Sequence, residues 1–70
     1  MNLKLRAARE KAGKTQAQVA REANLRERTY QNYEYEEREP GVRAAIRIAR
    51  VLNETVEVLF EKEVSDETLH

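Results

Sequence analysis

Apolar residues recur along this chain every three or four positions, which is the spacing of one face of an α-helix. This spacing predicts helices over residues 3–12, 16–23, 27–34, 42–52 and 56–61. Strong helix breakers are few, and they fall between these segments at Gly13, Pro40 and Gly41. The chain is therefore predicted to be all-α, with short connections and a polar tail at 64–70.

Capping chemistry indicates where these helices begin and end. Thr15 and Gln18 have the Thr-x-x-Gln spacing of a capping box, so a helix is expected to start near Gln16. Asn24 tolerates the left-handed conformation that often ends a helix, and Thr55 can cap the last segment. Two helices joined by a tight turn are thus predicted on either side of Asn24.

The fourth and fifth segments are each predicted to turn one apolar face inward. In the fourth, the inward positions are Val42, Ala45, Ile46, Ala49 and Leu52. Its solvated side is expected to carry Arg43, Arg47 and Arg50. In the fifth, the inward positions are Val56, Leu59 and Phe60. The remaining apolar side chains either form a patch for self-association or are scattered on the surface, and these are Ile48, Val51 and Val58.

In the third segment, Tyr30 and Tyr33 stand three positions apart and define an inward face, with Leu25 filling the core at the turn. Tyrosines can also stack on the bases of single-stranded nucleic acid. The helical spacing favours core packing for Tyr30 and Tyr33, whereas Tyr35 stays open to either role. The side chains expected to point outward are Arg26, Glu27, Arg28, Gln31 and Asn32.

Residues 15–34 resemble the Cro/C1-type helix-turn-helix of the XRE family, which occurs in phage repressors and small bacterial regulators. The resemblance covers residues 3–60 and includes Thr15-Gln16, Glu34, the leading helix from Leu5 to Ala12, Glu39-Pro40 and the segments 42–52 and 54–60. It implies a compact five-helix, lambda-repressor-like DNA-binding domain over residues 1–63, followed by the tail.

The resemblance also implies which side chains read DNA. The family's base-contacting positions correspond here to Glu27, Arg28 and Asn32, and Gln31 is a fourth candidate. In the major groove, Arg28 can pair with guanine, Asn32 can pair with adenine, and Glu27 can accept from cytosine. Without the surrounding motif, the same residues would be ordinary exposed helix residues.

Other positions correspond to contacts with the DNA backbone or within the protein. Gln16 begins the second segment, where helix N-terminal N–H groups attract phosphate, although a plain first-turn residue would look the same. Further phosphate contacts are expected from Arg26, Thr29, Tyr35 and Arg38. In relatives, the positions of Arg9 and Glu34 form an ion pair between the first and third helices, and the same structural pair is expected here.

Two departures from the family's pattern concern local packing. Arg26 stands where a Ser or Thr commonly caps the third helix, and Glu27 compensates in part through the helix dipole. Lys14 replaces the usual apolar residue before Thr15, which thins the core at that corner.

A third departure lies in the loop after the third segment, which is acidic where relatives usually carry Gly or Lys. Glu36 and Glu37 would repel nearby phosphates. Either these glutamates turn outward while Arg38 and Tyr35 face DNA, or binding is weak until two subunits combine.

The formal net charge is zero, but the charges are unevenly distributed. Residues 1–33 hold eight Lys/Arg against three Glu, whereas residues 34–70 hold five Lys/Arg against ten Asp/Glu. The basic half contains the segments expected to read DNA, which supports an electrostatic attraction that the net charge conceals. A solvated surface with a fortuitous bias is the alternative.

Composition argues against several other classes. The chain has no Cys, and neither a metal nor a cofactor is expected. The only Ser, Asp and His are Ser65, Asp66 and His70, in a polar terminus, so enzyme chemistry is not expected. No apolar run exceeds three residues, which argues against a signal peptide or a membrane span and for a cytoplasmic protein.

Two functions remain. The favoured one is a homodimeric transcriptional regulator, expected to repress, that binds double-stranded DNA at a near-palindromic operator. Dimerisation would also add buried surface to a chain of only 70 residues. The alternative is a protein-interaction module on the same scaffold, similar to an antitoxin or an anti-repressor partner, with weak DNA binding.

Overall fold

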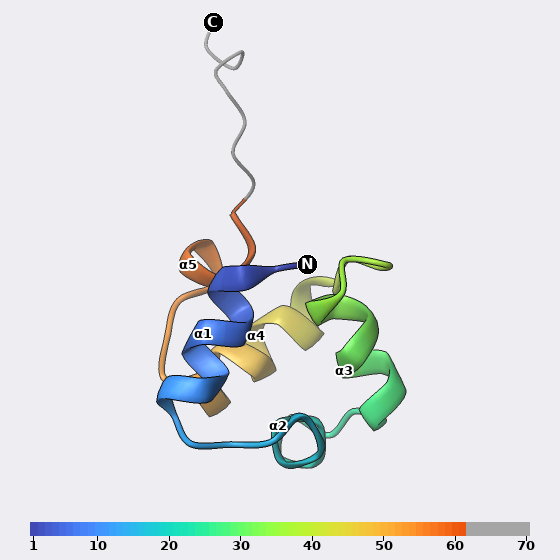
Figure 1. Ribbon diagram of the computed structural model, residues 1–70. Helices are drawn as coiled ribbons and strands as arrows, with labels where there is room; N and C mark the ends of the chain where they lie inside the picture. Colours follow the sequence, from blue (N-terminus) through green and yellow to red (C-terminus); the bar gives the residue numbers. More distant parts are fainter. Residues whose placement is uncertain (62–70) are drawn as a thin grey trace, which may run out of the picture.

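The computed structural model describes residues 1–61, which form five α-helices and no strand (Figure 1). In chain order the helices are α1 (Leu3–Lys11), α2 (Gln16–Glu22), α3 (Glu27–Glu34), α4 (Val42–Leu52) and α5 (Val56–Phe60). The predicted all-α class is confirmed, and every helix end lies within one residue of the predicted one. The tail predicted at 64–70, with Ser65, Asp66 and His70, lies outside the described residues.

The helix ends follow the predicted capping chemistry. The Thr15 hydroxyl accepts from the Gln18 backbone N–H at 3.0 Å, and the Gln18 side chain accepts from the Thr15 N–H at 2.8 Å. Gly13, Asn24 and Asn53 have positive φ angles of 72°, 61° and 57° and turn the chain after α1, α2 and α4. Glycine and asparagine tolerate this conformation better than bulky residues do. The connections can therefore be short, which holds consecutive helices against one another.

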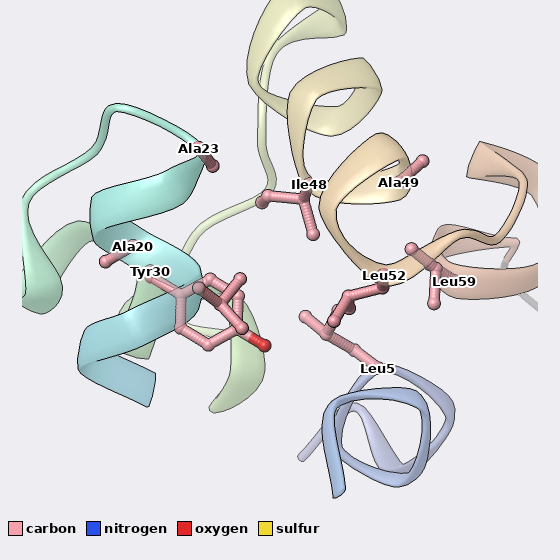
Figure 2. Close-up of a cluster of buried hydrophobic side chains, with 9 residues drawn as sticks. Leu5, Ala20, Ala23, Tyr30, Ile48, Ala49, Leu52 and Leu59 are labelled. Carbon is pink, nitrogen blue, oxygen red and sulfur yellow. The ribbon is translucent and has the colours of Figure 1, made fainter. Parts of the chain in front are cut away.

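The hydrophobic core lies where the helices meet, and Tyr30 of α3 is its largest fully buried side chain (Figure 2). Its members are Leu5, Val19, Ala20, Ala23, Tyr30, Ile48, Ala49, Leu52 and Leu59. The hydrophobic side chains partly buried against it include Leu25, Tyr33, Val56 and Phe60. The predicted inward faces of α3 and α5 are thus confirmed, and the burial of Tyr30 prevents it from stacking on a base.

The predicted inward face of α4 is wrong at its N-terminal end. Val42 is 75% exposed and Ile46 is 38% exposed, whereas Ile48 is fully buried. A face centred on Ile46 and a face centred on Ile48 both have helical spacing, so the pattern alone allows either. Packing against α2 and α5 selects the face that contains Ile48.

Of the two alternatives for Ile48, Val51 and Val58, the self-association patch is wrong, for the same reason. Ile48 lies inside the core, and Val51 is partly buried against it. Only Val58 remains exposed among the three residues of that patch.

Arg47 does not belong to the solvated side of α4, where it was expected with Arg43 and Arg50. It is partly buried, and its Nε donates to the Ala23 carbonyl oxygen at 2.8 Å. That carbonyl lies at the C-cap of α2, where helix carbonyls lack partners and the dipole favours a positive charge. Arg47 therefore fastens α2 to α4, while Arg43 and Arg50 are exposed as expected.

Asn2 ties the start of the chain to two distant helix ends. Its side chain accepts from the Leu5 N–H at 3.0 Å, which caps α1, and donates to the Leu59 carbonyl at 2.8 Å. Its backbone N–H donates to the Glu34 carbonyl at 2.7 Å. The first turn of α1 is thereby held beside the end of α3, where the polar cluster described next is found.

Candidate nucleic-acid interface

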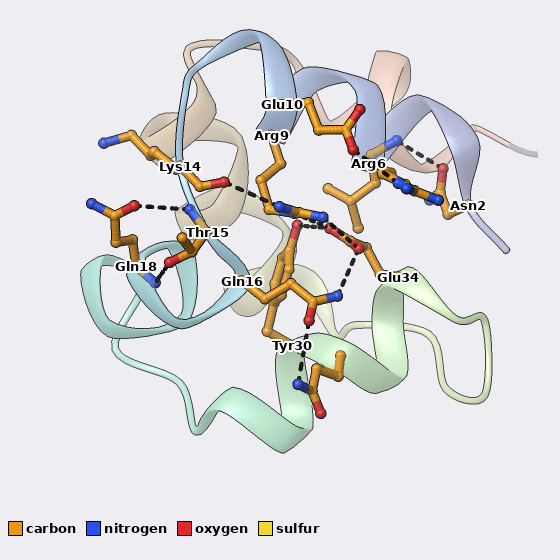
Figure 3. A network of polar contacts seen from close by, with 12 residues as sticks. Asn2, Arg6, Arg9, Glu10, Lys14, Thr15, Gln16, Gln18, Tyr30 and Glu34 are labelled. Atoms are coloured by element: carbon orange, nitrogen blue, oxygen red, sulfur yellow. Dashed lines mark hydrogen bonds and ion pairs between the residues drawn. The ribbon is translucent and has the colours of Figure 1, made fainter.

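A buried carboxylate, Glu34 at the end of α3, joins the first three helices (Figure 3). Arg9 of α1 donates to it from Nε at 2.6 Å and from Nη2 at 3.3 Å. Gln16 of α2 donates from Nε2 at 2.9 Å, and the Tyr30 hydroxyl donates at 2.7 Å. We call these four residues the Glu34 cluster. The Arg9 and Glu34 side chains are 13% and 1% exposed, so the two residues expected to pair meet away from solvent.

The cluster keeps Glu34 ionised although it is buried. Burial alone would raise the pKa of the Glu34 carboxyl, but hydrogen bonds from its three neighbours and the charge of Arg9 lower it below the ordinary value of 4.5. The hydrogen bond to Glu34 raises the pKa of Arg9. Burial, together with the hydrogen bond to Glu34, raises the pKa of Tyr30. At neutral pH the cluster is therefore a charged pair with two neutral donors.

Hydrogen bonds continue from this cluster to the outer side of α3. Gln16 Nε2 lies 3.3 Å from the Tyr35 hydroxyl oxygen. Gln16 Oε1 accepts from Gln31 Nε2 at 3.3 Å, and the same nitrogen donates to Glu27 Oε2 at 3.3 Å. A continuous path thus runs from the buried Glu34 carboxylate to the exposed carboxylate of Glu27.

Sequence reasoning treated Gln31 as a base reader and missed its contacts inside the protein. Glu27 and Gln31 are four positions apart on one helix, so their contact had a sequence signal. The contact between Gln31 and Gln16 had none, because it depends on how α2 and α3 pack.

The residues expected to read bases all belong to α3. Glu27 and Arg28 are exposed, and Gln31 and Asn32 are partly buried. Within residues 1–61, the Arg28 and Asn32 side chains make no hydrogen bond or ion pair. Their polar groups are therefore available to a ligand, unlike those of the Glu34 cluster.

The arrangement of α2, the turn at Asn24 and α3 has a counterpart among known protein families. A family model described as helix-turn-helix matches residues 5–59. The chain belongs to the XRE-type helix-turn-helix family. As a member of this family, it is a DNA-binding transcriptional regulator. Searches among curated proteins and among solved structures found no match.

The residues expected to bind phosphate lie on and around α3, the helix that is expected to read DNA. Arg26 and Arg38 are exposed, Tyr35 is 44% exposed, and Gln16 and Thr29 are partly buried. Arg26 occupies the N-cap of α3 and makes no side-chain capping bond there. The expected loss of a cap is thus confirmed.

The acidic loop begins directly after α3. The Asn32 carbonyl accepts from the N–H groups of Glu37 at 2.9 Å and Arg38 at 3.3 Å, which closes the helix end. Glu36 has a positive φ of 62°, and its Oε1 accepts from the Met1 ammonium group at 3.0 Å. Glu36 is therefore drawn toward the start of α1, while Glu37 and Arg38 are exposed.

Lys14 replaces apolar packing before α2 with polar contacts. Its Nζ lies 2.9 Å from Glu22 Oε1, and its carbonyl oxygen accepts from Arg9 Nη1 at 3.1 Å. The turn between α1 and α2 is thus held by the same arginine that pairs with Glu34.

Across residues 1–61, no helix is both long and apolar enough to cross a membrane. In the same range, no three His, Cys, Asp or Glu side chains are grouped to hold a metal ion.

Proposed function

We propose that the chain is a cytoplasmic homodimeric repressor that places α3 in the major groove of a near-palindromic operator. The observation that carries this proposal is the contrast within α3: Arg28 and Asn32 are unengaged within the described residues, next to a cluster in which Glu34 is fully paired. The major groove admits one α-helix and presents base edges to such side chains.

Each outward side chain of α3 has a proposed base partner. Arg28 forks onto O6 and N7 of guanine, and Asn32 pairs with N6 and N7 of adenine. Glu27 accepts from N4 of cytosine, with Gln31 beside it. Arg28 is the residue on which sequence selectivity is expected to depend most, because a bidentate contact to guanine is the most common specific contact.

Backbone contacts are proposed to set the register of the helix on the duplex. Both N–H groups of Gln16 are engaged, by Glu34 and by the Tyr35 hydroxyl, so Gln16 is proposed to act on a phosphate through the Tyr35 hydroxyl, 3.3 Å away. The Tyr35 hydroxyl accepts from Gln16 and keeps its own proton for a phosphate oxygen. Further phosphate contacts are assigned to Arg26, Thr29 and Arg38.

Two copies are proposed because one recognition helix covers only one half-site. Helices in a symmetric dimer reach half-sites one helical turn apart, about 34 Å. The basic half of the chain, residues 1–33, contains α2 and most of α3 and supplies electrostatic attraction in each subunit.

A protein-interaction module is the second candidate, and a groove favours it. The groove has a volume of about 830 Å³ and contains the exposed apolar residues Val42 and Ile46 beside Phe60. Its lining also includes the acidic residues Glu36, Glu39 and Glu61. An apolar segment of another protein with basic flanks would fit such a surface.

Selection of bound duplexes from a random pool tests the two candidates against each other. A DNA-binding dimer should enrich a near-palindromic consensus, and its affinity should fall with rising salt concentration. Enrichment of no consensus at any salt concentration would contradict the repressor proposal and favour the interaction module.

A further inference from the structure

We infer that the buried Glu34 carboxylate, acting through Gln16 and Gln31, sets which hydrogen-bonding atoms the recognition helix offers to DNA: acceptors at Gln31 and Glu27. This inference rests on the proposed function. It assigns Glu34 and Gln16, which do not read bases, a positioning role in base selectivity.

The first step is the orientation of Gln16. An ionised carboxylate only accepts hydrogen bonds, so the Gln16 amide must turn its nitrogen toward Glu34, at 2.9 Å. The second N–H of the same nitrogen is directed at the Tyr35 hydroxyl, at 3.3 Å. With both donors used, Gln16 Oε1 is the only atom of this amide that can face Gln31.

The second step is the orientation of Gln31. Because Gln16 presents an acceptor oxygen, Gln31 must turn its nitrogen toward it, and Gln31 Nε2 donates to Gln16 Oε1 at 3.3 Å. The same nitrogen donates to Glu27 Oε2 at 3.3 Å, so both of its N–H groups are used. Within residues 1–61, no donor is bound to Gln31 Oε1. An isolated glutamine can present either end of its amide, but this one is held with its oxygen as the free end.

The third step concerns the base that meets these two side chains. Glu27 and Gln31 together offer oxygen atoms, which match the amino groups of cytosine N4 and adenine N6. Guanine O6 and thymine O4 are also acceptors, so their partial negative charges would repel the oxygens of Glu27 and Gln31. The path from Glu34 therefore favours cytosine or adenine over guanine or thymine at one position of the strand that faces Gln31.

The test compares base preferences of the wild type, Gln31→Met and Gln16→Met on a pool of random duplexes. The position whose preference changes in Gln31→Met identifies the base that faces residue 31. There the wild type should favour an amino-bearing base by about tenfold, the discrimination expected of a good polar contact. In Gln16→Met, only Glu27 still holds the Gln31 nitrogen, so the orientation of Gln31 is less fixed and the preference should fall to about twofold at that position only. Gln18→Met, on the same helix but off this path, is the matched control and should keep the wild-type preference.

Three results would overturn the inference. One is a Gln16→Met protein that weakens all sequences alike and keeps the preference, which would make Gln16 a backbone contact only. Another is a Gln31→Met protein with no altered position, a result that would reject the inference even if Gln16→Met does not fold in thermal unfolding. The third is a wild-type consensus with guanine or thymine at the altered position. A wild type that selects no consensus at all would instead reject the proposed function, and this inference with it.

Discussion

The two faces of α3 use polar side chains in opposite ways. On the inward face, Tyr30 and Glu34 are fully buried, and Glu34 is bound to partners from α1 and α2. On the outward face, Arg28 is exposed, and neither Arg28 nor Asn32 makes a side-chain hydrogen bond or ion pair within the described residues. One face thus holds the helix in the protein, which leaves the side chains of the other face available to a ligand.

The difference has a simple energetic basis. A buried charge is costly unless it is paired, so the inward face must satisfy every oxygen of Glu34. An exposed charge is solvated by water and needs no partner within the protein, so the outward face can exchange water for DNA. The same contrast occurs on α1, where Arg9 pairs with Glu34 in the interior and Arg6 pairs with Glu10 at the surface.

The largest effect is expected from removing the buried carboxylate. Glu34→Ala strands the Arg9 guanidinium and should lower the free energy of unfolding by about 3–5 kcal/mol. Glu10→Ala is the matched control, because its pair with Arg6 has side chains 47% and 56% exposed. That control should change stability by about 0.5 kcal/mol or less. Equal thermal unfolding of Glu34→Ala and wild type would contradict the structural role of the pair.

Acid should remove the contribution of the buried Glu34 carboxylate to the stability of the fold. Folding lowers the pKa of Glu34 below 4.5, so its contribution to stability is present above that pH and is lost as the pH falls through the lower, folded-state pKa. Wild type should lose stability in this range more steeply than Glu34→Gln, by at most about 1.4 kcal/mol per pH unit. Unfolding measured from neutral to acidic pH checks this, and parallel curves for the two proteins would count against it.

Restoring the missing cap should strengthen the fold and weaken binding. Arg26→Ser supplies an acceptor at the N-cap and should raise the free energy of unfolding by about 1 kcal/mol. It should also weaken binding to all duplexes alike, because a phosphate contact is lost. Arg26→Ala loses the same contact without gaining a cap, so only its stability should differ from that of Arg26→Ser. Equal stability of the two variants would show that the absence of a side-chain cap does not destabilise the fold.

The smallest effect is expected in the acidic loop. Glu37→Lys keeps the Glu36 contact with Met1 and places a positive charge where a phosphate is proposed to lie nearby. One added phosphate contact should steepen the salt dependence by about threefold in affinity between 50 and 200 mM salt. Replacing both Glu36 and Glu37 by Lys should steepen it further. If both variants show the same dependence of DNA affinity on salt concentration as the wild type, the loop lies away from DNA.

Helix ends were predictable because local chemistry sets them. The capping box of Thr15 and Gln18 and the left-handed residues Asn24 and Asn53 act within a few positions along the chain. The fold class and the inward face of α3 followed from periodicity in the same way. The ion pair between Arg9 and Glu34 was predicted from the family resemblance and not from spacing.

Contacts between helices were not predictable from these patterns. Ile48 was misplaced on α4 because two faces share helical spacing and only packing against α2 and α5 chooses between them. Arg47 and Asn2 were missed because their partners, the carbonyls of Ala23 and Leu59, are backbone atoms, which carry no residue-type signal. The contact of Gln31 with Gln16 depends on the same kind of information.

The central claim, that the outward face of α3 reads bases without holding the fold, is tested most directly by Arg28→Ala. Its base preferences and its thermal unfolding should be measured together. The account predicts wild-type unfolding and a loss of about 1–3 kcal/mol of discrimination confined to one base pair of the operator. Unchanged preferences, an equal loss for every sequence, or a large loss of stability would contradict it.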